Sequence, residues 1–136
     1  VAATRALHMA RVRREIAWAQ EIKSPMDESM EMLEKLQERR DYTYKRLCEI
    51  DGINVVNAQA SLYMFPRVEM IGKVWKTNEE FLLELLNEER VAFSNGNDYG
   101  KDGFGHFRTL FLNDTGVLEE VYNRLDRYIR RHTREA

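Results

Sequence analysis

The stretch Val91–Leu112, VAFSNGNDYGKDGFGHFRTLFL, decides how the rest of the chain is interpreted. Its two ends, residues 91–93 and 106–112, have the apolar, aromatic and β-branched composition of strands. The loop between them holds four of the chain's seven glycines, and glycine permits positive φ and close approach of the backbone to a ligand. The stretch therefore predicts a strand, a glycine-rich loop and a second strand.

One cation, Arg108, lies inside the second predicted strand, next to Phe107 and two places before Leu110. A buried and unpaired guanidinium costs about 3–5 kcal/mol, so Arg108 needs a carboxylate partner. An internal Asp or Glu is the usual partner of an Arg in a strand. The alternative is a carboxylate that arrives with a ligand, which a planar guanidinium grips through two parallel hydrogen bonds.

The composition is that of an ordinary soluble domain, with 136 residues, of which 43% are hydrophobic and 32% charged. The net charge of −2 gives no reason to expect nucleic acid or an anionic membrane as a partner. No apolar run approaches the roughly 20 residues of a membrane span, and early arginines interrupt any signal-peptide core. The single cysteine, Cys48, suits a reducing compartment, which predicts a cytoplasmic location.

Capping residues and apolar periodicity predict the remaining elements. They are helices over 4–22, 24–50, 77–90 and 116–132, strands over 53–56 and 62–65, and an irregular connection over 67–76. Because short connections between consecutive strands favour antiparallel pairing, we expect an α/β fold of the α+β type. Its small mixed sheet is mostly antiparallel, with helices packed on one face. We expect residues 1–23 to form a separate helical segment and residues 24–136 to form the domain.

Four blocks of the sequence together resemble the carboxy-terminal small domain of class I and II pyridoxal-phosphate-dependent aminotransferases of fold type I. They are ERRDYTYKRLCEIDGINVV, QASLYMFPRV, EEFLLELLNEERVAFSNGNDYGKDGFGHFRTLFL and LEEVYNRLDRYI, which occur in the family's order within residues 28–132. The resemblance implies that residues 24–136 are this small domain. It also implies that residues 1–23 lead out of a large domain that the chain lacks.

In that family an arginine of the small domain grips the α-carboxylate of the amino-acid substrate, and Arg108 stands at the matching position. The resemblance thus favours the ligand carboxylate as the partner of Arg108. The block SLYMFP matches a segment at the substrate entrance, which makes Tyr63 a second substrate-binding candidate. The alternative for Tyr63 is a core aromatic residue with a solvated hydroxyl. The chain departs from the family at Asn95, where Pro is frequent, and at Tyr99, where Phe is frequent.

The resemblance also implies a homodimeric enzyme that uses pyridoxal 5′-phosphate to transfer an amino group between an amino acid and a 2-oxo acid. The family's cofactor lysine lies in a Ser-x-x-Lys-like segment followed by glycine and arginine, and no lysine of this chain has that context. We therefore expect the chain alone to be inactive and to bind neither the cofactor nor a metal. The alternatives are a free-standing amino-acid-binding or regulatory module and an interaction domain without catalysis.

Overall fold

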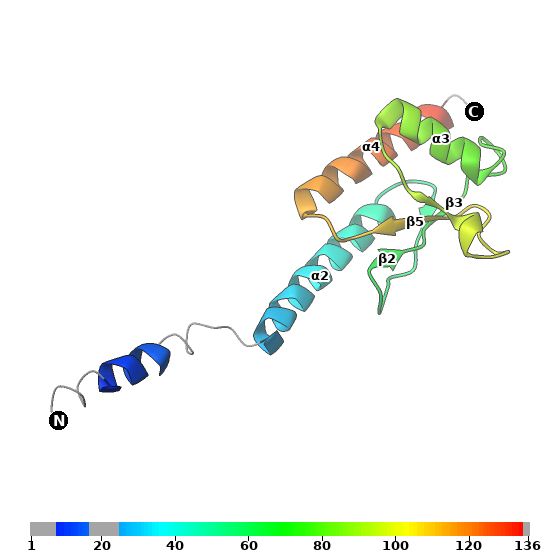
Figure 1. Ribbon diagram of the computed structural model, residues 1–136. Coiled ribbons are helices and arrows are strands. Elements are labelled where there is room, and N and C mark those ends of the chain that lie inside the picture. Colours follow the sequence, from blue (N-terminus) through cyan, green and yellow to red (C-terminus); the bar gives the residue numbers. More distant parts are fainter. Residues whose placement is uncertain (1–7, 17–24, 135–136) are drawn as a thin grey trace. The chain divides into compact units, whose positions relative to one another are not determined.

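The structure is a computed structural model in which residues 8–16 and 25–134 are described (Figure 1). The chain divides into two compact units, residues 1–35 and residues 36–136. The first unit contains a helix over residues 8–16 and the start of α2 (Pro25–Cys48). The helix predicted over 4–22 is confirmed for residues 8–16, and its remainder lies outside the described residues, as does Ser24, the predicted start of the next helix. The domain boundary at residue 24 stays a prediction.

The second unit combines helices with short antiparallel strands. After α2 the chain forms β1 (Ile53–Asn54), β2 (Tyr63–Met64), β3 (Arg67–Val68), α3 (Asn78–Glu89), β4 (Ser94–Asn95), the 3₁₀ helix η1 (Gly96–Tyr99), β5 (Phe107–Leu110) and α4 (Thr115–Thr133). Strand β1 pairs with β3, and β5 lies between β2 and β4 in a three-stranded sheet. These pairs are all antiparallel, so the predicted α/β fold class with mostly antiparallel strands is confirmed.

Strand pairing is where the sequence-based expectations were wrong in detail. The segment expected to be irregular contains β3, whose Val68 lies opposite Ile53 of β1. Strand β2 pairs with the distant β5 instead of its sequence neighbour, which produces two small sheets. Strand β4 begins at Ser94, beyond the predicted strand over residues 91–93. Strands of two residues are too short for an alternating pattern, so their sequence does not reveal their partners.

The core lies between one face of β5 and the helices α3 and α4, which contact each other and cross in the view of Figure 1. Alternate residues of β5, Phe107 and Thr109, are buried, and the Thr109 hydroxyl lies 3.1 Å from the Tyr122 hydroxyl of α4. Because side chains alternate along a strand, Arg108 points to the opposite face of the sheet from Phe107. Helix α3 buries Phe81 and Leu85, whereas the neighbouring Leu86 is 40% exposed.

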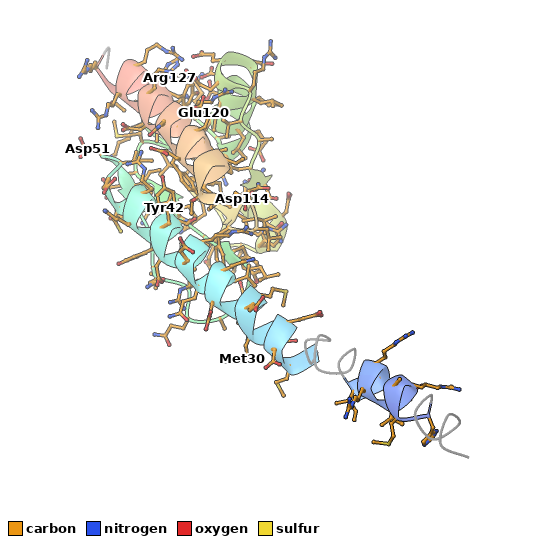
Figure 2. All side chains as sticks on the ribbon, turned by 90° about the vertical axis from the view of Figure 1, so that its left-hand side faces the viewer. Met30, Tyr42, Asp51, Asp114, Glu120 and Arg127 are labelled. Atoms are coloured by element: carbon orange, nitrogen blue, oxygen red, sulfur yellow. The ribbon has the colours of Figure 1, made fainter. Side chains whose placement is uncertain are left out.

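The end of β5 is anchored to α2. The guanidinium of Arg39 donates hydrogen bonds to the carbonyl oxygen of Leu112 and to the carboxylate of Asp114, the residue that precedes α4. Two turns further along α2, Arg46 donates to the side-chain oxygen of Asn123 in α4 at 2.7 Å. Figure 2 shows this part of α2, marked by Tyr42, beside α4. These contacts fix where β5 ends and therefore where its exposed face lies.

Candidate carboxylate-binding site

Arg108 lies at the second position of β5, directly opposite Ser94 of β4, and is half-buried. Its Cζ lies 4.6 Å from the centroid of the Tyr99 ring and 5.4 Å from that of the Tyr63 ring. Tyr63 comes from the neighbouring strand β2, and Tyr99 ends the 3₁₀ helix. Cation–π contacts of this kind contribute about 0.5–1 kcal/mol each at exposed sites. The guanidinium is thus oriented by two aromatic rings from separate elements.

The guanidinium of Arg108 forms no ion pair with an acidic residue within residues 8–16 and 25–134. Its Nε is buried and has no hydrogen-bond partner. By contrast, Arg39 and Arg124 donate to carboxylates. A buried donor without an acceptor costs about 1–3 kcal/mol, so an incoming acceptor at Arg108 is favoured. The internal Asp or Glu considered as its partner has no counterpart in the described part of the chain.

Further aromatic rings surround the tyrosines on this face. Phe65 stacks on the His106 ring with centroids 4.9 Å apart and an interplanar angle of 9°. Phe65 also meets the Tyr99 ring edge to face, at 6.0 Å. Tyr63 is 44% exposed, so it is not the core residue that one interpretation of the sequence required. The roles of Tyr63 and Arg108 in binding substrate stay predictions.

A pocket of about 730 Å³ opens beside this cluster, between the segment before β4, the strand β5 and the first half of α4. Its lining includes Arg108, Thr109 and Leu110 of β5 and Val117, Val121 and Arg124 of α4. Tyr63 and Tyr99 do not line the pocket. Arg108 is the residue that both lines the pocket and contacts the two tyrosine rings. The pocket lies on the α4 side of β5, whereas the Arg108 side chain points to the opposite face, so the tyrosine-lined face and not this pocket is where its guanidinium meets a ligand.

The glycine-rich loop is held by hydrogen bonds from within the chain. The side-chain oxygen of Asn95 accepts from the backbone N–H of Asn97 at 3.0 Å, and its amide donates to the Glu79 carboxylate at 2.6 Å. The backbone N–H of Glu79 and then the Asn95 amide lower the pKa of the Glu79 carboxyl below its ordinary value. Asn95, which replaces a frequent proline of the family, thus fixes the start of the loop by hydrogen bonding.

Sequence reasoning attributed the glycines to close approach of a ligand, whereas at two of them the structure shows close approach of backbone to backbone. The Gly96 N–H donates to the His106 carbonyl at 3.0 Å. A Cβ on Gly96 would lie 2.4 Å from that carbonyl oxygen, and a Cβ on Gly103 would lie 2.1 Å from the carbonyl oxygen of Gly96. The two ends of the loop can cross only because both positions are glycine.

Sequence reasoning missed two residues that belong to the site. Tyr99 stood out only as a departure from the family, and its contact with Arg108 depends on the path of the loop. Asn78, the first residue of α3, is fully buried and hydrogen-bonded to the glycine-rich loop. Its position directly after Thr77, the predicted start of this helix, gave no sign of that contact, because no local pattern links the start of α3 to the loop.

The described lysines lie at the surface. A lysine that reacts with this cofactor needs a lowered pKa, which burial or a neighbouring cation provides. Every described lysine is exposed, at Lys35, Lys45, Lys73, Lys76 and Lys101. In the described part of the chain, no three His, Cys, Asp or Glu side chains gather as metal ligands, and no helix is both long and apolar enough to cross a membrane. What the site offers is a guanidinium suited to a carboxylate.

Comparisons with known proteins identify the family of the chain. The model of the family described as aminotransferase class I and II matches residues 5–125. The glutamate-pyruvate aminotransferase AlaA of Haemophilus influenzae is 30% identical over 95 residues, which cover 70% of this chain and 24% of that protein. An aspartate aminotransferase of Bacillus subtilis is 29% identical over 111 residues, which cover 80% of this chain and 28% of that protein. The chain therefore spans about a quarter of the length of these curated relatives.

Solved structures share the fold. An alanine aminotransferase from Pyrococcus furiosus superposes with a TM-score of 0.74 and 42% identity, over 80% of this chain and 27% of that one. An aromatic aminotransferase from Pyrococcus horikoshii superposes with a TM-score of 0.71 and 30% identity, over 82% of this chain and 29% of that one. With a family match that covers most of its residues, the chain belongs to the class I and II aminotransferase family and corresponds to part of such an enzyme.

Proposed function

We propose that this chain is the carboxy-terminal small domain of a pyridoxal-phosphate-dependent aminotransferase, in which Arg108 binds the α-carboxylate of the amino-acid and 2-oxo-acid substrates. The observation that carries this proposal is the set of contacts that the Arg108 guanidinium makes and lacks. It contacts two tyrosine rings, has a buried Nε without a partner and has no acid beside it in the described part of the chain. Membership of the family supports amino-group transfer as the reaction of the complete enzyme. The geometry of Arg108 supports carboxylate binding as the role of this chain.

The arrangement suits binding and orientation of a carboxylate. Two parallel hydrogen bonds from a planar guanidinium fix both the position and the rotation of the bound group. Tyr63 and Tyr99 restrain the guanidinium before the ligand arrives, so less rotamer freedom is lost on binding. A guanidinium is not a proton donor or acceptor in proteins, so the role of Arg108 is to bind and orient the carboxylate. Pyridoxal phosphate, bound by the rest of the enzyme, supplies the electron sink for amino-group transfer.

The same proposal assigns the remaining parts of the enzyme to the longer protein. A large domain outside this chain supplies the cofactor lysine, since the described lysines are exposed. The complete enzyme is a homodimer in the cytoplasm, and the chain by itself has no transaminase activity. Arg108 then acts across the boundary between the domains, where it holds one end of a substrate whose other end reacts elsewhere.

Substitution of Arg108 in the complete enzyme tests the proposal. Loss of one partner from a hydrogen-bonded charge pair costs about 2–5 kcal/mol, so Arg108→Ala should lower kcat/KM for the amino acid at least about 30-fold. Arg108→Lys should recover little, because an ammonium lacks the planar pair of donors. Arg130→Ala is the control, since this exposed arginine of α4 pairs with Asp126 on its own helix. Unchanged kcat/KM in Arg108→Ala, with Arg130→Ala also unchanged, would exclude the clamp.

A further inference from the structure

Asn78 is a fully buried polar residue at the first position of α3. Its side chain turns away from its own helix, whose first turn is capped by the Thr77 hydroxyl accepting from the Glu80 N–H at 3.2 Å. The side-chain amide of Asn78 donates to the carbonyl oxygens of Gly103 at 2.9 Å and His106 at 3.0 Å, and to the side-chain oxygen of Asn95 at 3.0 Å. Its own side-chain oxygen accepts from the Gly105 N–H at 2.8 Å.

These bonds meet where the two ends of the glycine-rich loop cross. One side of the crossing is Gly96, whose N–H donates to His106, and the other side is Gly103. An amide group has two N–H donors, so the acceptor oxygens around Asn78 share them. The buried amide therefore joins the two ends of the loop, because it donates to the side-chain oxygen of Asn95 at the start and to the backbone oxygens of Gly103 and His106 at the return. Each carbonyl also accepts from a backbone N–H, that of His106 from Gly96 and that of Gly103 from His106, so the Asn78 amide adds a second donor at each.

The segment between the two ends of the crossing carries Tyr99. Its ring lies 4.6 Å from the Cζ of Arg108, and β5 with Arg108 itself begins two residues after Gly105. The loop leaves the crossing at Gly96 and returns to it at Gly103. Displacement of either end would move the Tyr99 ring relative to the guanidinium, although the side-chain hydrogen bonds of Asn78 go to neither Tyr99 nor Arg108.

We propose that Asn78 is a positioning residue for Arg108, because its side-chain amide fixes the loop crossing that places the Tyr99 ring against the guanidinium. This inference rests on the proposed role of Arg108 as the carboxylate clamp. Asn78 does not touch the substrate. Asn78 acts through the loop, which restrains the position of the Arg108 guanidinium before the carboxylate binds.

The substitution Asn78→Asp separates this role from helix capping. Aspartate keeps the acceptor for the Gly105 N–H and suits the first turn of a helix, where acidic residues are favourable. It removes the two N–H donors and places a negative charge against the oxygens of Gly103 and His106. Asn87→Asp is the matched control, since Asn87 is an exposed residue of the same helix and gains the same charge. Asn78→Ser, which keeps one hydroxyl donor, serves as the second variant.

The readout is the NMR spectrum of the Arg108 side chain in this chain. The Tyr99 ring shifts the Arg108 Hδ and Hε resonances, so Asn78→Asp and Asn78→Ser should move them toward their random-coil positions. The methyl resonances of Leu85 and Leu125 in the core should stay dispersed, and Asn87→Asp should change neither set. Unchanged Arg108 resonances in either folded variant would overturn the positioning role. No substrate is present, so this failure is distinct from a failure of the clamp, which the kinetics of Arg108→Ala decide.

A measurement on the unaltered chain covers the case in which both variants unfold. The proposal requires that the crossing is closed whenever the Tyr99 ring lies against Arg108. The amide of Gly105, which donates to Asn78, should then exchange with solvent much more slowly than the amide of an exposed loop residue such as Lys101. Slow exchange of the Gly105 amide, together with Arg108 resonances displaced from their random-coil positions, supports the proposal. Equal exchange rates for the two amides, with Arg108 still shifted, would overturn it.

Discussion

The carbonyl oxygen of Gly96 occupies the space where a side chain on Gly103 would begin, since a Cβ on Gly103 would lie 2.1 Å from it. Neither group can move alone, because the Gly96 N–H donates to His106 and the Gly103 carbonyl accepts from the buried Asn78. The proximity of these two residues is what allows the loop to return to β5. The geometry of the site thus depends on an approach that only glycine permits.

Gly103→Ala should destabilise the chain severely. The methyl group meets backbone atoms on the opposite side of the crossing, so the free energy of unfolding should fall by about 3 kcal/mol, the upper part of the range for overpacking. Gly116→Ala is the control, because no atom lies within 4 Å of its Cβ position. Within α4 that change should be neutral or stabilise by up to about 1 kcal/mol. Urea unfolding followed by tryptophan fluorescence measures both, and equal stabilities of the two variants would contradict the close approach.

Tyr99 offers a test of the ring contact at the guanidinium. Replacement by Leu keeps an apolar side chain and removes the aromatic face, so a contact of about 0.5–1 kcal/mol is lost. In the complete enzyme Tyr99→Leu should raise KM for the amino acid about two- to fivefold with kcat nearly constant, because uniform binding is weakened. Tyr99→Phe keeps the ring and should behave as the unaltered enzyme. A loss of the same size in Tyr99→Phe would attribute the effect to the hydroxyl.

The fold prediction succeeded where the sequence is periodic. Leu118, Tyr122 and Leu125 recur at helical spacing and are all buried in α4. It failed for strand pairing, because β3 has only two residues and its partner β1 is specified by the tertiary arrangement. For the site, Arg108 was identifiable as a cation in an apolar strand. Its contact with Tyr99 was not, because the path of the loop depends on a crossing that no local pattern encodes.

The buried carboxylate of Glu89 joins α3 to α4. Its side chain is 5% exposed and accepts hydrogen bonds from Arg127, labelled in Figure 2, and from Arg131. Glu89→Gln should lower the free energy of unfolding by about 1.5 kcal/mol, the lower end of the contribution of hydrogen bonds to charged groups. Glu119→Gln, at an exposed position of α4, is the control and should change stability little. Thermal unfolding at neutral pH distinguishes the two variants.

The carboxylates of Glu89 and its neighbour Glu88 predict how the free energy of unfolding depends on pH. Hydrogen bonds from Arg127 lower the pKa of the Glu89 carboxyl, and the contact with His132, followed by Arg131, lowers the pKa of Glu88. Their contribution to stability is complete above the ordinary carboxyl pKa of 4.5 and is lost as the pH falls through the lowered values in the folded chain. Unfolding measured from pH 6 to pH 3 should therefore show a shallower loss in Glu89→Gln. Parallel curves would contradict the assignment.

Calorimetry with the chain alone separates a domain of an enzyme from a free-standing amino-acid sensor. A single guanidinium open to solvent on one side supplies little affinity, because it loses the remaining contacts that a complete site provides. We expect no measurable heat on titration with amino acids, with or without Arg108. Saturable binding of an amino acid that disappears in Arg108→Ala would instead support a sensor.

The central claim is that Arg108 recognises the carboxylate of the substrate, and a paired-substrate measurement tests it most directly. The complete enzyme and its Arg108→Ala variant are compared on the preferred amino acid and on the matching amine that lacks the carboxylate. The account predicts a strong preference of the unaltered enzyme for the amino acid and at least a roughly 30-fold smaller preference in the variant, which loses a contact of about 2–5 kcal/mol. An equal preference in both enzymes would contradict the account, because another group would then recognise the carboxylate.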